Sequence, residues 1–295
     1  MQSALRTLLD GVIDYAGLFP PAKHSMREAV SRYLRYVQGP EEWMLGRFLC
    51  PAGRLLELES ELDHQGSEVE VPVGVVGTGG STLETFEAAL EEDIGHMNAF
   101  QDAAGERASV EAFEVRTPSL AETPAAIADL EGFSGVEAYL EVPLAEGLDE
   151  ALAAIAETDW MGAKARTGGL EPSAFPPSHA LAGFIRECSH LDLSYKLTAG
   201  LHEPLYRKHP GMDAMAHGFL NVLVGAALME AHDLSRDELQ EVLEERHAFG
   251  FGSGIAWREL TATENDVRAA RELFVAFGSC SVDEPVDGLR RAGLL

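Results

Sequence analysis

Two lysines stand in similar settings in a chain that contains only four lysines. Lys164 lies in the segment GAKARTGG and Lys196 in the segment SYKLTAG, and each ends a short apolar run before a turn with glycine. This pattern is typical of the carboxyl end of a buried parallel strand, where barrels of alternating strands and helices carry their chemistry. A buried lysine is costly unless it is paired or functional. Two such lysines favour Schiff-base chemistry, because one ammonium group lowers the pKa of the other amine and leaves it free to attack a carbonyl.

Acidic side chains occupy comparable positions on two preceding strands. If Glu114 and Glu141 point inward with the two lysines, two carboxylates and two ammonium groups share one cavity. Glu141 could then move protons for an iminium formed on a lysine. The same four groups could instead form an ion-pair network that only fixes the barrel.

Other polar residues follow the same strand ends. Arg166 could clamp a carboxylate or phosphate with its planar fork, or pair with Glu141 or Glu114. Arg47, on an earlier strand, is open to the same two interpretations. We predict that Thr167 and Thr198, which follow the two lysines in the sequence, bind the substrate. The expected chemistry requires no metal ion and no cofactor.

Three histidines allow a second hypothesis. His202 lies in the loop after the strand of Lys196, where it would face the pocket and relay protons or bind an anion. With His209 and His217 it could instead bind a metal ion for a hydrolase or lyase. The spacing lacks a helical His-x-x-x-His, and no His-x-His ends an early strand, so we expect no metal ion. An exposed loop position for His209 and a core or helix-terminal position for His217 are the simpler interpretations.

Strands and helices alternate from residue 45 onward, which favours a parallel sheet with helices outside. A (β/α)8 barrel of the TIM type fits better than an open dinucleotide-binding sheet, because no G-x-G-x-x-G motif opens a helix after the first strand. Six strands are predicted over residues 45–50, 69–76, 110–115, 136–142, 160–165 and 193–198.

The two ends of the chain fit this alternation less well. Residues 1–40 are predicted to form an N-terminal helical extension, with helices over 3–13 and 26–37, and residues 41–295 the barrel domain. The last two units of the barrel are irregular. A seventh strand is expected in the glycine-rich segment 248–257, and an eighth would end at residues 277–281.

Composition excludes several classes of partner. The chain has 22 lysines and arginines and 49 aspartates and glutamates, which gives a net charge of −27. Such a charge repels nucleic acid and anionic membranes. No apolar run reaches the roughly 18 residues of a membrane helix, and the first residues lack the apolar stretch of a signal peptide. The three cysteines show no CxxC spacing, which suits a reducing compartment. We therefore expect a cytoplasmic protein, and a homo-oligomer is compatible with the sequence.

The two lysine segments resemble the deoxyribose-phosphate aldolase group of class I aldolases. The segment from Lys164 to Gly168 is similar to that family's Lys-x-x-Thr-Gly, and the segment from Lys196 to Gly200 to its Lys-x-x-Gly-Gly. The resemblance implies that Lys164 is the Schiff-base lysine and Lys196 the neighbour that lowers its pKa. The family has these lysines one strand later than the fifth and sixth strands predicted here, and Glu114 lies roughly where it has a general-base aspartate.

The end of the chain carries a further part of the resemblance. Residues 277–281 read FGSCS and are similar to the family's Phe-Gly-Ala-Ser-Ser, which implies that Gly278, Ser279 and Ser281 hold a phosphate through amides and hydroxyls. The chain also resembles a set of bacterial proteins that share residues 14–21 and 277–285, a resemblance that implies no function.

Together these residues predict a lyase or aldolase that acts on a small anionic carbonyl compound. Lys164 would be the nucleophile, with Lys196, Glu141 and His202 as its catalytic neighbours. A metal-dependent hydrolase or lyase and a non-catalytic anion-binding barrel remain the alternatives. The last would have its cavity filled by bulky residues and Lys164 held by Glu141.

Overall fold

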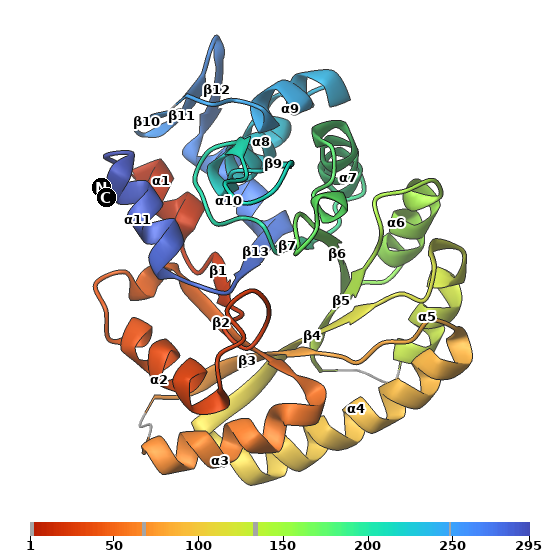
Figure 1. The fold of residues 1–295 in the computed structure, drawn as a ribbon. Coiled ribbons are helices and arrows are strands. Elements are labelled where there is room, and N and C mark those ends of the chain that lie inside the picture. The colour runs from red at the N-terminus through yellow and green to blue at the C-terminus, as the bar shows by residue number, and fades with distance from the viewer. Residues whose placement is uncertain (1–2, 67–68, 132–134, 248) are drawn as a thin grey trace.

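Eight parallel strands close into a barrel in the part of the chain that the computed structural model describes, residues 3–66, 69–131, 135–247 and 249–295 (Figure 1). The first and last strands of the barrel, β1 and β13, pair with each other and complete the circle. This confirms the TIM-type barrel. The barrel strands are β1 (Ile13–Tyr15), β2 (Leu45–Pro51), β3 (Val71–Val76), β4 (Ala108–Arg116), β5 (Glu137–Glu141), β6 (Met161–Arg166), β7 (Tyr195–Thr198) and β13 (Phe274–Ser279).

Helices follow the strands and cover the outside of the barrel (Figure 1). Their starts carry the expected caps: the Thr82 hydroxyl accepts from the backbone amide of Thr85, and the Ser25 hydroxyl from that of Glu28. In the described residues, no helix is long and apolar enough to cross a membrane. The α-helices are α1 (Ser3–Leu9), α2 (Met26–Val37), α3 (Leu55–Gln65), α4 (Leu83–Ala104), α5 (Thr123–Leu130), α6 (Leu148–Ala156), α7 (Ser178–His190), α8 (Phe219–His232), α9 (Arg236–Leu243), α10 (Glu264–Leu273) and α11 (Asp283–Arg291).

The N-terminal segment contributes a barrel strand, where the sequence predicted helices only. Helix α1 ends at Leu9, and Gly11 takes a left-handed φ of +58°, which turns the chain into β1. All three residues of β1 are buried between β2 and β13. Because so short a strand shows no alternation of apolar and polar residues, its sequence could not be told from the end of a helix. The lysines consequently lie on the sixth and seventh strands of the barrel.

The expected seventh barrel strand lies elsewhere. Residue 248 is outside the described part, and residues 250–257 belong to a separate antiparallel sheet of β10 (Gly250–Phe251), β11 (Gly254–Trp257) and β12 (Leu260–Thr263). This sheet packs against α1, α8 and α10 and projects from the barrel at the top of Figure 1. The long stretch between β7 and β13 also holds a hairpin of β8 (Arg207–Lys208) and β9 (Met215–Ala216), which explains the wide separation of Lys196 from Gly278.

The strand register brings the predicted residues side by side. Lys164 on β6 is paired in register with Glu141 on β5 and with Lys196 on β7. Because side chains alternate along a strand, Lys164 and Arg166 point to one face of β6, while Ala163 and Ala165 are fully buried on the other. The fold therefore positions the two lysines and Glu141 as neighbours near the carboxyl ends of their strands.

Candidate functional site

A cavity of about 510 Å³ opens at the carboxyl ends of the strands, and we call it the carboxyl-end cavity. Its size falls within the range of small-molecule sites, roughly 300–1,000 Å³. Glycines and apolar side chains form most of its wall. The charged or titratable residues that line it are Glu114, Glu141, Lys164, Arg166, His202, His209 and Cys280.

Lys164 stands between two carboxylates in the wall of this cavity. Its Nζ lies 2.7 Å from Oε2 of Glu114 and 3.0 Å from Oε2 of Glu141. Lys164 is only 5 % exposed and Glu114 only 1 %. On the outer side, Arg166 Nε lies 3.4 Å from Oε1 of Glu141, so the interaction predicted for Arg166 is present in its ion-pair form.

Lys196 lies deeper and does not line the cavity. Its Nζ contacts Oδ2 of Asp14 and Oε1 of Glu114, both at 2.5 Å, and sits 5.1 Å from the centre of the Tyr139 ring. Glu114 therefore bridges the two lysines with its two carboxylate oxygens. The two amines do not share the cavity, because the carboxylate lies between them.

The carboxylates reverse the pKa effect that the sequence predicted for Lys164. Burial lowers the pKa of this amine, but Glu114 and Glu141 outweigh burial, and the pKa lies above its ordinary value. For Lys196, burial likewise lowers the pKa and Asp14 and Glu114 raise it by more. Burial raises the pKa of Glu114, yet the two ammonium groups hold it at about 2. In the free protein both lysines are therefore charged at neutral pH, and Lys164 becomes a nucleophile only when a neighbour takes its proton.

Asp14 is a member of this network that the sequence analysis did not identify. Its Oδ2 holds Lys196, and its Oδ1 accepts the backbone amide of Arg47 at 2.7 Å. A side chain at Gly46 would overlap with this carboxylate, so the glycine leaves room for it. The sequence signal was an acidic residue within the apolar stretch from Val12 to Tyr15, of which Ile13–Tyr15 form β1.

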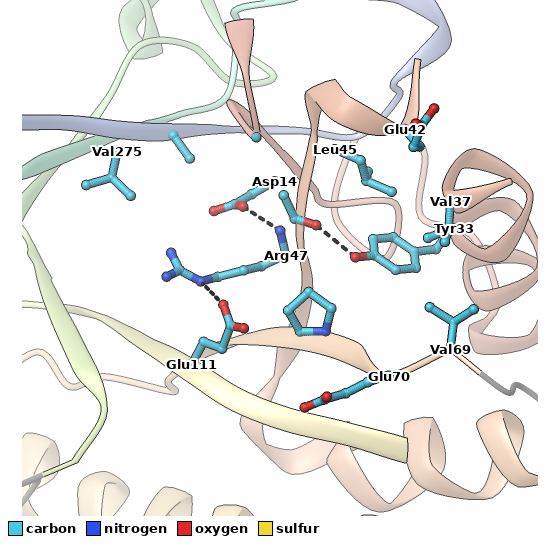
Figure 2. A pocket seen from close by; sticks show the side chains of 14 residues that line it. Asp14, Tyr33, Val37, Glu42, Leu45, Arg47, Val69, Glu70, Glu111 and Val275 are labelled. Atoms are coloured by element: carbon cyan, nitrogen blue, oxygen red, sulfur yellow. Dashed lines mark hydrogen bonds and ion pairs between the residues drawn. The ribbon is translucent and has the colours of Figure 1, made fainter. Parts of the chain in front are cut away.

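A second cavity, of about 390 Å³, opens at the amino ends of the strands, and we call it the amino-end cavity. Figure 2 shows Arg47 within it, with its guanidinium directed at Glu111 and Asp14 beside its backbone. Arg47 Nε lies 3.0 Å from Glu111, and its NH2 group lies 3.0 Å from Glu137. Asp14 therefore borders this cavity on one side and holds Lys196 on the other.

The predicted substrate-binding residues divide into two groups. Thr198 and Gly278 line the carboxyl-end cavity, as Arg166 does. Three others do not, because their hydroxyls are engaged within the loops. The Thr167 hydroxyl donates to the carbonyl of Ala199 and, at 3.3 Å, to that of Thr198. The Ser279 hydroxyl donates to the carbonyl of Ser281 at 2.6 Å. The Ser281 hydroxyl accepts from the Glu284 amide at 3.2 Å.

The three histidines are not brought together. His202 lines the cavity with Nδ1 2.8 Å from Oε2 of Glu284, and His209 lines it with its ring against Phe175. His217 is buried elsewhere, with Nε2 2.8 Å from the carbonyl oxygen of Pro176, in the core position expected for it. Among the described residues, no group of three or more His, Cys, Asp or Glu side chains is arranged to hold a metal ion.

No model of a known protein family matches the chain, and no curated protein matches it either. The chemistry of the site is that of a primary amine at a cavity wall, with one carboxylate fully buried behind it and a second, Glu141, at the cavity surface.

Proposed function

We propose that the protein is a lyase or aldolase-like enzyme that binds a small carbonyl compound as a Schiff base on Lys164. One observation carries the proposal: Lys164 is the amine that lines the carboxyl-end cavity, and two carboxylates within 3.0 Å stand ready to exchange its proton. A cavity at this end of the barrel is where enzymes of this fold act.

The proposed reaction begins with a proton transfer. Glu141 takes a proton from the Lys164 ammonium group, and the free amine attacks the carbonyl carbon to form a carbinolamine. The protonated Glu141 returns that proton to the carbinolamine hydroxyl, which leaves as water. The resulting iminium carries the same positive charge as the ammonium group it replaces, so the Glu114 carboxylate stabilises it without rearrangement.

The iminium then serves as an electron sink. Glu141, again a carboxylate, can remove a proton from the carbon next to the iminium, which gives an enamine. It can instead remove the proton of a β-hydroxyl group; that oxygen then becomes a carbonyl, the carbon–carbon bond breaks, and its electron pair passes to the iminium. Lys196 acts as a positioning residue, because it holds Glu114 from behind without reaching the cavity.

Two further observations support this assignment. Counted with β1, the lysines lie on the sixth and seventh strands, which is where the resemblance to class I aldolases puts them. The alternative of a non-catalytic barrel draws support from the pairing of Lys164 with Glu141, but that alternative also expects a filled cavity, and this one is open. A cytoplasmic location, which the three free buried thiols suit, belongs to the proposal as well.

Reductive trapping tests the proposal. The protein is incubated with borohydride and a panel of small aldehydes and ketones, digested, and analysed by peptide mass. Because the chain has four lysines, each adduct can be assigned to one residue. We expect the reduced adduct on Lys164, at a rate that rises with pH as the raised pKa of this amine is approached.

The controls come from the other lysines. Lys208 is exposed and its ammonium group pairs with Asp213, so Lys208→Met should trap as the natural protein does. Lys164→Met should lose the adduct. Equal labelling of Lys164 and of the exposed lysines, or no labelling at all, would contradict the proposal.

A further inference from the structure

The body of the carboxyl-end cavity is apolar. Phe19, Leu49, Phe175 and Met212 are among the side chains that line it. Leu170 stands at the wall with 62 % of its surface exposed, the largest value among the large apolar residues that the structure describes as exposed. An exposed apolar side chain in the wall of a cavity marks a surface that a ligand can cover.

The charges in the cavity wall are already balanced. The two cations, Lys164 and Arg166, face two carboxylates, Glu114 and Glu141, and all four take part in the ion pairs described above. Iminium formation preserves this balance, because the iminium has the charge of the ammonium group. Arg166 could accept one carboxylate, because its side chain is half exposed and its contact with Glu141 is long. Among the described residues, no further free cation lines the wall.

The loop between β13 and α11 also lacks a place for a dianion. The Ser279 hydroxyl and the Ser281 hydroxyl have partners within the chain. The first turn of α11 carries Asp283 and Glu284, whose negative charges oppose a phosphate at that helix terminus. The His202 imidazole, which could otherwise meet a phosphate there, has Nδ1 2.8 Å from the Glu284 carboxylate. With a net charge of −27, the whole protein adds a repulsive field for anions.

From these observations we infer that the Schiff-base substrate is an unphosphorylated aldehyde or ketone with an apolar body, whose carbonyl meets Lys164 and whose chain lies against Leu170 and Phe175. The reaction rests on the proposed function, but the preference for apolar ligands does not. It follows from the cavity wall alone. This inference narrows the anionic substrate class expected from the sequence. The substrate carries at most one carboxylate, and that carboxylate would bind at Arg166.

Reductive trapping with matched aldehydes tests the preference. Hexanal and benzaldehyde are compared with glycolaldehyde phosphate and with glyoxylate over the same series of concentrations, and adducts at Lys164 are quantified by peptide mass. We expect half-saturation at a concentration about tenfold or more lower for the apolar aldehydes than for the phosphorylated one. Equal or better trapping of the phosphorylated aldehyde overturns the inference.

A binding measurement keeps this test separate from the test of the reaction. Calorimetric titration with 1-hexanol and benzyl alcohol, which cannot form a Schiff base, is compared with titration with glycerol phosphate. Binding of the alcohols without any trapped adduct supports the apolar site and refutes the Schiff base. Tighter binding of glycerol phosphate than of both alcohols refutes the apolar site whatever the trapping shows.

Two variants locate the effect. Leu170→Ser should weaken trapping of hexanal several-fold, while Leu56→Ser, at an exposed apolar position on α3 that does not line the cavity, should leave it unchanged. Glu284→Gln removes the carboxylate that pairs with His202 and should improve trapping of glycolaldehyde phosphate several-fold, without a change for hexanal. An equal loss in the two leucine variants would place the apolar contact outside the cavity.

Discussion

The two ends of the barrel each hold a cation between two carboxylates, yet they differ in the kind of cation and in how far the carboxylates are buried. At the carboxyl end, Lys164 pairs with Glu114 and Glu141, whose side chains are 1 % and 13 % exposed. At the amino end, Arg47 pairs with Glu111 and Glu137, whose side chains are about half exposed. Figure 2 shows the contact with Glu111. A lysine can lose its proton and attack a carbonyl, whereas a guanidinium group stays charged under all ordinary conditions.

Burial of the carboxylates separates the two ends. The partners of Lys164 are largely shielded from water, whereas those of Arg47 are open to water, so their ion pairs are screened by salt. Asp14 and Lys196 link the two ends, since Asp14 borders the amino-end cavity and Lys196 holds Glu114. Each prediction below changes one end and uses the other as its control.

The largest effect is expected from the two cations themselves. Lys164→Met should abolish the reductive adduct, because no other amine lines the carboxyl-end cavity among the described residues. Arg47→Met should leave the trapping rate within about threefold, because Arg47 lies at the other end of the barrel. Peptide mass after borohydride treatment measures both. An adduct that persists in Lys164→Met, or disappears in Arg47→Met, would erase the distinction between the ends.

Removal of one carboxylate from each end should separate them in stability. Glu114→Gln leaves two buried ammonium groups without their shared partner and should lower the free energy of unfolding by about 3–5 kcal/mol. Glu111→Gln removes one exposed partner of Arg47 and should cost less than about 1 kcal/mol. Urea denaturation followed by circular dichroism compares the two. Equal losses would mean that burial does not distinguish the two networks.

The buried network should also set the pH range of stability. Because the pKa of Glu114 is lowered to about 2, its contribution is present above the unfolded value of about 4.3 and is lost as the pH falls from there toward 2. Because the pKa values of Lys164 and Lys196 are raised, their contributions are present below about 10.4 and are lost as the pH rises through the folded values.

Urea midpoints measured across pH should therefore form a plateau with an acid limb worth about 3 kcal/mol. Glu111→Gln should keep that limb, and Glu114→Gln should lose most of it. An acid limb that survives in Glu114→Gln would assign the loss of stability to other carboxylates.

Asp14 allows a finer test, because it acts on Lys164 only through Lys196 and Glu114. Asp14→Asn removes one negative charge next to Lys196. The positive charge of Lys196 then offsets more of the negative charge of Glu114, which is the charge that raises the pKa of Lys164. Arg47 and Tyr139 also face Lys196 and stay in place. The pKa of Lys164 should fall, and the pH of half-maximal trapping should move down by about one unit, or about tenfold in rate at a fixed lower pH.

Glu137→Gln is the matched control, since it removes a charge from Arg47 at the amino end and should not move the pH profile. If Asp14→Asn lowers the trapping rate equally at every pH, Asp14 only supports the structure and has no influence on the amine.

Much of the barrel could be predicted from the sequence, because six of its strands are apolar runs separated by helices of clear periodicity. Strand β1 could not be predicted, because three buried residues show no alternation of apolar and polar side chains. The glycine-rich segment before Trp257 could not be assigned to the correct sheet, because its composition suits several kinds of strand. Of the site, the neighbours Lys164, Lys196 and Glu141 follow from register, which successive strand ends imply.

The remaining members of the site depend on contacts between distant parts of the chain. Asp14 meets Lys196 across 182 positions in the sequence, and nothing local marks that contact. The sign of the pKa change at Lys164 depends on whether a carboxylate or an ammonium group lies nearer, and Glu114 lies between the two amines. Sequence patterns place side chains on strands, but the distances that set the pKa come from the closed barrel.

The smallest effect compares two turns with left-handed backbone, one at each end of the barrel. Ala199, after β7, has φ of +62°, and Gly11, before β1, has φ of +58°. A side chain costs about 1–2 kcal/mol in this conformation, while glycine loses more entropy on folding, so Ala199→Gly should stabilise the protein by less than about 1 kcal/mol. Gly11→Ala should destabilise it by about 1 kcal/mol, and strain alone is responsible, because nothing lies within 4 Å of the added carbon. Urea denaturation measures both changes, and opposite signs are required: a loss of stability in Ala199→Gly would show that the methyl group packs against the cavity wall and that this turn is held by contacts instead of backbone preference.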